Sequence, residues 1–396
     1  MEFLFETYAS LVEPMQELFR KRLTENKFQI EVERAGVIKK AGWDELENDG
    51  ERKAHCIAYG FTIRSAACDV IRCILPACTQ ANMGLVGNGR FYSGLISKLL
   101  TQGLGEGHAL AASIQEALNT QIPTFIKRAA KNTYQADNHR NMRRLCGLLF
   151  AGIPIEKSAE VVLLEDRPEE PSIHLLTSMI FPHVQHSTEQ IRQIVKTFSE
   201  DQRKEIVATY FGERKSKRDR PGRALESGYP INFDIVAGFA EYRDLQRHRM
   251  LTQQRQDLGV LLGYSIPEEI IEIGREKIVQ ECFERSETLH GDLKRAGMEE
   301  EAQYVTLFNH FIRWNVGMNL RELGHLTELR TQKAGHPKYR RIVQVMAKQF
   351  LKRSPEMEPV LKFVDYNDYD QSIARADQEA RTARKSLAAG VFDDMD

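Results

Sequence analysis

Apolar residues recur at helical spacing through most of this chain, and only two short runs have the composition of strands. Residues 2–22 show the helical pattern first, with large apolar side chains three or four positions apart. The same pattern predicts further helices at 55–79, 91–100, 108–118, 172–180, 188–210, 267–296, 299–329 and 338–351. Residues 161–164 are apolar and β-branched, and residues 231–235 alternate apolar with polar side chains, as strands do. A helix-rich chain with a few short strands is therefore expected.

The composition excludes several classes of protein. With 396 residues the chain is long enough for two or three domains, and 42% hydrophobic residues are ample for a buried core. Because 55 basic residues balance 56 acidic ones, there is no overall bias toward nucleic acid or membrane, and any anion site must be a local cluster. No apolar run approaches the ~20 residues of a membrane span. The first residues lack a basic segment and are not a signal peptide, so we expect a cytoplasmic protein.

The cysteine and histidine patterns do not predict a metal site. Six cysteines are present and none forms a Cys-x-x-Cys pair, which indicates free thiols in a reducing compartment. His174, His183 and His186 are close in sequence, but no cysteine or carboxylate partner accompanies them. We therefore favour surface histidines over a metal cluster.

Four arginines lie within thirteen residues in the first part of the second half: Arg243, Arg247, Arg249 and Arg255. Asp244 lies among them, and Asp257 follows Arg255 by two positions. Planar guanidinium groups suit phosphate or carboxylate oxygens, and each charge-assisted contact contributes roughly 1.5–3 kcal/mol. The alternative at this point is a solvated basic face of a helix.

Two blocks of the sequence share an order and a spacing. The same interval of eighteen positions separates Arg72 from Arg90 and Gln303 from Arg321, and the blocks end in Asn88-Gly-Arg90 and Asn319-Leu-Arg321. Each is followed by an apolar helix and a Gly-His pair, at 107–108 and 335–336. Duplication of one supersecondary unit explains this order, and chance similarity between helical segments is the alternative.

Taken together, these segments resemble the flavin-dependent thymidylate synthases. That family carries an Arg-His-Arg motif, matched by Arg247-His248-Arg249, and a later Asn-x-Arg-Ser-Leu-x-His-Phe-Leu-x-Leu-Arg stretch followed by a histidine. Here the later stretch reads Asn319-Leu-Arg321-Glu-Leu-Gly-His325-Leu-Thr-Glu-Leu-Arg330, and His336 follows it. The resemblance indicates one complete domain over 158–375, an incomplete and mostly helical copy over 1–152, and a mobile, acidic-ended tail over 376–396.

The resemblance implies a fold and a reaction. The fold is α+β, a mixed sheet with flanking long helices, and the family assembles as a homo-oligomer with flavin at the subunit contacts. The reaction transfers a methylene group from methylenetetrahydrofolate to the uracil of dUMP. Reduced FAD, regenerated by NADPH, delivers the hydride, and the protein positions the flavin and supplies charge. No cysteine nucleophile is needed.

The resemblance also implies roles for individual residues. Arg321 is the expected catalytic residue, because a guanidinium there stabilises developing negative charge on the nucleotide. The expected cofactor-binding residues are Arg247, His248, Arg249, Asn319, His325 and His336. The expected substrate-binding residues are Arg321, Thr252, Gln254, Asn88 and Arg90. For each histidine, a packed or capping role is the alternative.

The chain departs from the family at several positions. Thr252 and Gln254 are mild replacements of Ser and Asn, whereas Arg255 reverses the charge of a family Glu. Asp257 and Gly259 stand where the family has the Ser and Arg that hold the nucleotide phosphate, and an Asp there repels phosphate. A catalytically inactive relative acting as a scaffold or partner subunit is therefore a second hypothesis. A module binding anions or nucleic acid through 214–223 and 243–255 is a third, which the scarcity of aromatic residues disfavours.

Overall fold

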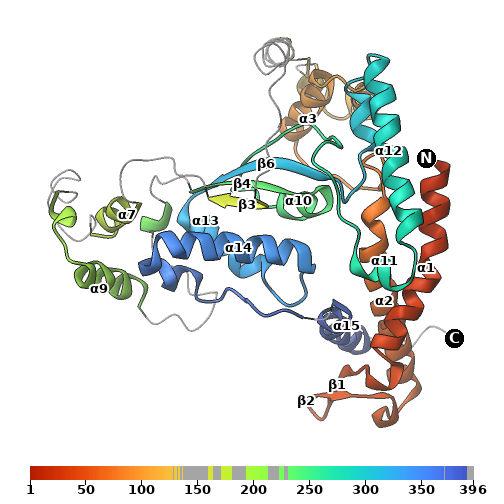
Figure 1. Cartoon of the computed structure of the whole chain (residues 1–396), viewed down its shortest axis with the longest axis horizontal. Helices are drawn as coiled ribbons and strands as arrows, with labels where there is room; N and C mark the ends of the chain where they lie inside the picture. Colours follow the sequence, from red (N-terminus) through yellow and green to blue (C-terminus); the bar gives the residue numbers. More distant parts are fainter. Residues whose placement is uncertain are drawn as a thin grey trace. The chain divides into compact units, whose positions relative to one another are not determined.

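A computed structural model describes residues 1–127, 129–131, 133, 136, 159–163, 171–180, 193–212, 223–226, 231–369 and 371–389 (Figure 1). The chain divides into two compact units. The first comprises 1–76, 158–287 and 306–396, and the second 77–157 and 288–305. These units do not follow the sequence boundary at 152–158, which remains a prediction about repeats along the chain.

The centre of the first unit is a four-stranded antiparallel sheet. Its strand order is β3-β4-β6-β5, formed by β3 (Val161–Leu163), β4 (Ile231–Gly238), β6 (Phe311–Met318) and β5 (Thr252–Arg255). Every second residue of β4 is buried, with Phe233 fully enclosed, as expected for a strand with one face on the core. Both strand-like runs of the sequence are therefore confirmed as strands, and so is the α+β class. The sheet is antiparallel where a mixed sheet was expected.

Strand β6 corrects a prediction. Residues 299–329 were expected to be helical, but they contain a 3₁₀ turn η6 (Glu301–Val305), the strand β6 and the helix α13 (Leu320–Arg330). The side chains of β6 alternate between core and intermediate burial in its first half, and Trp314 is only 1% exposed. Pairing with β4 over eight residues outweighs the local helical pattern.

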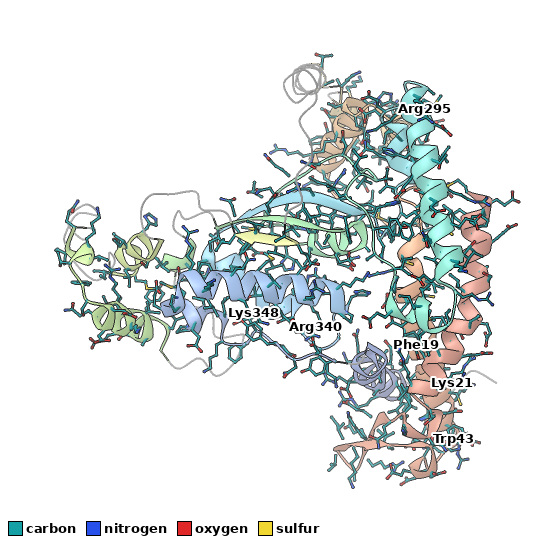
Figure 2. The ribbon with its side chains drawn as sticks, in the orientation of Figure 1. Phe19, Lys21, Trp43, Arg295, Arg340 and Lys348 are labelled. Atoms are coloured by element: carbon teal, nitrogen blue, oxygen red, sulfur yellow. The ribbon has the colours of Figure 1, made fainter. Side chains whose placement is uncertain are left out.

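Helices cover one face of this sheet. Helices α13 and α14 (Pro337–Arg353) lie on that face, as Figure 1 shows, and α10 (Phe239–Leu245) follows β4 directly. Figure 2 labels Arg340 and Lys348 on α14. Arg340 is 3% exposed, and its guanidinium donates to the Thr331 and Asn367 carbonyls, both at 2.9 Å. The first unit also contains α7 (Pro171–Ile180), α9 (Glu200–Phe211), η5 (Arg223–Glu226) and η7 (Pro355–Leu361).

A second layer of the first unit is built from α1 (Glu2–Arg22) and α2 (Asp49–Ile71). Phe19 of α1, labelled in Figure 2, is fully buried in the core shared by these helices. Between the helices lie η1 (Glu25–Lys27), η2 (Trp43–Glu45) and a hairpin of β1 (Ile30–Arg34) and β2 (Val37–Ala41); the element η3 (Arg72–Ile74) follows α2. The helix expected over 267–296 is two helices, α11 (Glu268–Glu272) and α12 (Glu276–Arg295), separated at Gly274 with φ +68°.

The carboxy-terminal segment is helical, which corrects the prediction of a mobile tail over 376–396. Residues of α15 (Gln371–Ala388) pack against α2 and β1, and Ala380 and Ala383 are buried. Asp377 binds Lys40 at 2.7 Å and also Lys333, and these contacts hold the pKa of its carboxyl below the usual value against the opposing effect of burial. Residues 390–396 lie outside the described part of the chain.

The second unit is a small helical cluster. It contains α3 (Gly89–Thr101), α4 (Gly105–Asn119) and α5 (Pro123–Ile126), which meet around Ile96, Ala111 and Ile126. In neither unit do the described residues include a helix that is long and apolar enough to cross a membrane.

Candidate functional site

The register of β5 against β6 brings the two arginine-bearing segments of the sequence together. Thr252 pairs with Gly317 in this antiparallel ladder. Residues just before Thr252 therefore lie beside those just after Gly317, where Asn319 caps α13. The Arg-His-Arg segment is consequently placed at the amino-terminal end of α13. It lies in a turn after α10 ends at Leu245, so the alternative of a basic helix face is wrong for these residues.

His248 is the contact between the two segments. Its side chain is buried, its Nδ1 lies 3.0 Å from Glu322 Oε1, and Arg330 Nε donates to its Nε2 at 2.9 Å. Because a guanidinium N–H only donates, Nε2 must be the acceptor, and the ring proton must be on Nδ1. His248 is thus a neutral Nδ1–H tautomer whose two nitrogens are both bonded within the chain.

The same cluster extends to two further histidines. The His325 ring stands edge-on to His248, with ring centroids 5.6 Å apart, and its side chain is exposed. The Arg330 guanidinium lies over the Tyr339 ring at 5.8 Å, and Tyr339 is 6.3 Å from the ring of His336. His336 caps α14, where its Nδ1 accepts from the Lys338 N–H at 3.3 Å. The structure therefore brings His248, His325 and His336 near one another, and their roles in cofactor binding remain predictions.

The four clustered arginines divide into two pairs. Arg243 stacks over the Phe308 ring at 4.6 Å, and burial lowers the pKa of its guanidinium. Arg255 lies over the Tyr242 ring at 5.9 Å. Arg247 and Arg249 are exposed, and the side chain of Arg247 is 65% accessible. Arg255 is exposed as well. Arg247 and Arg249 are the exposed guanidinium groups beside the start of α13, where an anionic ligand is expected.

Arg247 forms an ion pair with Asp244. Asp244 lies 3.3 Å from the Arg247 guanidinium and 3.5 Å from that of Arg72, which also meets Asp69 at 3.6 Å. Arg72 comes from the end of α2, so the amino-terminal part of the chain contributes to this network. It was not among the predicted site residues.

The Arg72–Asp244 pair gives a testable coupling. We expect a double-mutant cycle with Arg72→Ala and Asp244→Ala to give about 0.5–1 kcal/mol of coupling in the free energy of unfolding, because both side chains are only partly shielded from water. Urea titrations of the four proteins measure it. Strictly additive effects would show that the contact contributes nothing to stability.

The predicted nucleotide-contacting residues are placed at the edge of this cluster. Asn319 Oδ1 accepts from the Glu322 N–H at 2.9 Å, and Arg321 lies in the first turn of α13. Thr252 and Gln254 are exposed on β5 and, being two positions apart, point to the same face of the strand. Exposed donors of this kind, next to the amino-terminal end of a helix, favour a phosphate or another anion.

Asn88 and Arg90 belong to the second unit. Asn88 caps α3 and accepts from the Phe91 N–H at 2.9 Å, and Arg90 is exposed in the first turn. Asn88 thus has the local role that Asn319 has in α13. Their predicted part in substrate binding remains a prediction.

A buried carboxyl group lies at the start of α10. Glu241 is 3% exposed, and its Oε1 has no hydrogen-bond partner within the described part of the chain. Burial raises the pKa of the Glu241 carboxyl, while the charges of Lys338 and Arg72 act in the opposite direction. Lys338 itself donates to Ser265 Oγ at 3.0 Å.

Glu241→Gln is expected to stabilise the protein by about 1–3 kcal/mol at neutral pH, because the cost of burying a charge is removed. Folding raises the pKa of the Glu241 carboxyl, so the folded state favours the protonated form. The contribution of that carboxyl to the free energy of unfolding is therefore fully present below its unfolded pKa and is lost as pH rises through its folded pKa. The advantage of the Gln variant should therefore shrink toward about pH 4. Urea unfolding at both pH values tests this, and a Gln variant less stable at neutral pH would contradict it.

Sequence reasoning missed Glu322 and Arg330, the two partners of His248. The Asn-x-x-Glu pattern at 319–322 signals a helix start, but nothing in the sequence shows that its Glu turns toward a histidine. No group of three metal-ligating side chains occurs in the described residues. His174 is among those residues, whereas His183, His186, Cys146 and the basic stretch 213–222 lie outside them.

Comparisons with known proteins place the site in a wider context. Residues 184–356 match the family described as thymidylate synthase complementing protein. The chain is 30% identical over 391 residues to a UPF0159 protein of Chlamydia pneumoniae, covering 96% of this chain and 67% of the relative. A UPF0159 protein of Chlamydia muridarum is 32% identical, with 96% and 68% covered, and one of Thermoplasma acidophilum is 28% identical, with 98% and 75% covered.

Among solved structures, the chain resembles a UMP/dUMP methylase from Streptomyces cacaoi bound to 5-Br dUMP. The TM-score is 0.41 with 15% sequence identity, over 53% of this chain and 98% of that one. The chain spans about two thirds of the length of the chlamydial relatives.

Proposed function

Since the chain belongs to the same family as the UPF0159 proteins, and its residues 184–356 match the thymidylate synthase complementing protein family, we propose that it is a nucleotide methylase of the thymidylate synthase type. It methylates the uracil of dUMP or a related nucleotide, using methylenetetrahydrofolate and reduced FAD. One observation carries the proposal: the Arg247–Arg249 turn and the start of α13 meet through His248.

The donor set of this cluster fits FAD. The cofactor carries a pyrophosphate, and the exposed Arg247 and Arg249 offer guanidinium groups of the matching geometry. His325 and His336 add ring nitrogens or stacking surfaces at the edge, and Asn319 orders the start of α13. Bound and reduced, FAD would supply the hydride of the reaction, with NADPH as reductant.

The nucleotide side of the site rests on Arg321. Its guanidinium would hold a phosphate or uracil oxygen and stabilise negative charge that develops on the base. Thr252 and Gln254 would add hydrogen bonds from β5. Burial raises the pKa of Cys73 to about 12 and also raises the pKa of Cys282, so neither of these two thiols is suited to act as a nucleophile.

A second candidate function is a scaffold or partner subunit without catalysis. Asp257 is exposed and Gly259 half-buried just after β5, at the positions where the family holds the nucleotide phosphate. Their replacement removes a phosphate contact and adds a repulsive charge. This reading predicts flavin or partner binding without turnover.

We also propose that the chain carries a tandem duplication. A shift of 231 positions carries α12 onto α2, η6 onto η3, Asn319 and α13 onto Asn88 and α3, and α14 onto α4. The same shift relates Asn309 to Cys78 and Tyr304 to Cys73. Two equivalent backbone hydrogen bonds result: the Asn309 N–H donates to the Cys73 carbonyl, and the Cys78 N–H donates to the Tyr304 carbonyl. A superposition of 49–126 on 280–357 in an experimental structure would test it.

The deciding experiment is an isotope assay in a buffered, oxygen-free reaction. Protein, FAD, NADPH and methylenetetrahydrofolate labelled in its one-carbon unit are mixed with dUMP, and the nucleotide is analysed by mass spectrometry. Label in dTMP supports the methylase, and a matched reaction without FAD should give none. Flavin binding with no labelled product would favour the scaffold. Light scattering of the same preparation tests the proposed homo-oligomer.

A further inference from the structure

The buried His248 has a role that the family resemblance does not assign. The side chain of His248 is 4% exposed, and it contacts Glu322 in the first turn and Arg330 in the last turn of α13. The ring is the only side chain of the Arg-His-Arg segment that is buried, while its two neighbours project into solvent. Whatever fixes the ring therefore fixes the backbone from which Arg247 and Arg249 project.

We propose that Glu322 and Arg330 are positioning residues of this site. They hold His248 as a single neutral tautomer, and through it they anchor the arginine-bearing turn to α13. The expected effect on FAD binding rests on the proposed function. The way in which Glu322 and Arg330 hold His248 concerns only residues of this chain.

The charges of the three side chains explain why both partners are needed. Glu322 is the third residue of α13, where the helix dipole favours a carboxylate, and Arg330 is in the last turn, where it favours a cation. Each stands at the end of the helix that suits its charge, so the helix itself orients the acceptor and the donor. The neutral ring between them accepts one hydrogen bond and donates the other.

Removal of either partner has a defined consequence. Without Arg330, Nε2 loses its donor, and the contacts no longer select the Nδ1–H tautomer over the Nε2–H tautomer. Without Glu322, the Nδ1–H group loses its acceptor and the turn loses its link to the start of α13. Glu322→Gln retains an amide oxygen that accepts from Nδ1–H, so it is the conservative variant.

The experiment combines NMR with a binding titration. Protein labelled with ¹⁵N in histidine is recorded at neutral pH without cofactor, and the His248 signals are assigned with a His248→Gln variant. The wild type should show a neutral ring protonated at Nδ1, Glu322→Gln should keep that pattern, and Arg330→Met should lose it. FAD affinity, measured by quenching of flavin fluorescence, should fall about tenfold in Glu322→Ala and Arg330→Met and less than about threefold in Glu322→Gln.

Arg341→Gln is the matched control, because Arg341 is an exposed arginine of α14 paired with Glu160 at 2.9 Å. It should leave both readouts unchanged. A His248 ring protonated at Nε2 in the wild type, or unchanged FAD affinity in Glu322→Ala and Arg330→Met, would overturn the inference. A wild-type protein that binds no FAD would overturn the proposed function instead, and the NMR pattern would still decide how His248 is held.

Discussion

Replacing Arg321 by glutamine is expected to lower kcat/KM for dUMP by about 10²-fold, equivalent to the loss of one or two charge-assisted contacts. The residue lies in the first turn of α13, next to the cap Asn319, so its side chain starts from a fixed backbone. If Arg321 acts mainly on charge that develops on the base, kcat should carry most of the loss. Steady-state kinetics at saturating FAD measure both constants.

The control for Arg321 is an arginine with the same charge and no place in the site. Arg295→Gln removes an exposed arginine paired with Asp292 at the end of α12, and it should leave kcat/KM within about twofold of wild type. Flavin affinity of Arg321→Gln should also stay close to wild type. Full activity in Arg321→Gln would remove this residue from the nucleotide site.

Trp314→Ala should lower the free energy of unfolding by about 3–5 kcal/mol, the usual cost of deleting a buried aromatic side chain. Trp314 is 1% exposed in β6, opposite Ile235 of β4 and Arg255 of β5, and its ring meets Tyr242 at 5.4 Å. The substitution removes the largest fully buried side chain of β6, one of the two inner strands of the sheet. Urea unfolding followed by circular dichroism gives the value, with an unchanged m-value showing that the folded state is retained.

Trp43→Ala is the comparison, since the sequence has only two tryptophans. Trp43 is only partly buried, beside His55 at a ring distance of 5.4 Å, in the 3₁₀ turn before α2. The smaller area removed from water predicts a loss of about half that of Trp314→Ala. A larger loss at Trp43 than at Trp314 would mean that the sheet is not the main source of stability.

Local sequence patterns predicted those elements whose burial follows one simple period. The amphipathic pattern of 2–22 gave α1, and the alternation at 231–235 gave β4. β6 was missed because one continuous helix was predicted over 299–329, through Gly317 and into α13. Pairing with β4 on one side and β5 on the other is what makes this segment a strand. α15 was missed because small residues such as Ala380 and Ala383 form its buried face, so no large apolar side chains mark it.

The resemblance predicted several residues of the site but not the contacts that join them. The resemblance named Arg247–Arg249 and Asn319–Arg321, and the β5–β6 register brings these segments together. The partners of His248 follow from that register and from the direction of α13, and neither is encoded in local spacing. Arg72 is more distant still, 172 positions from Asp244. Whether the named residues bind flavin and nucleotide remains a prediction.

An absorbance titration of the purified protein with FAD tests the central claim most directly, with an Arg247→Gln/Arg249→Gln variant run in parallel. The account predicts a bound, spectrally perturbed flavin at about one equivalent per site in the wild type. It predicts a loss of affinity of about 10²-fold in the variant, whose folded state should be intact by circular dichroism. Wild-type protein that leaves the flavin spectrum unchanged, or a variant that binds FAD as tightly as wild type, would contradict it.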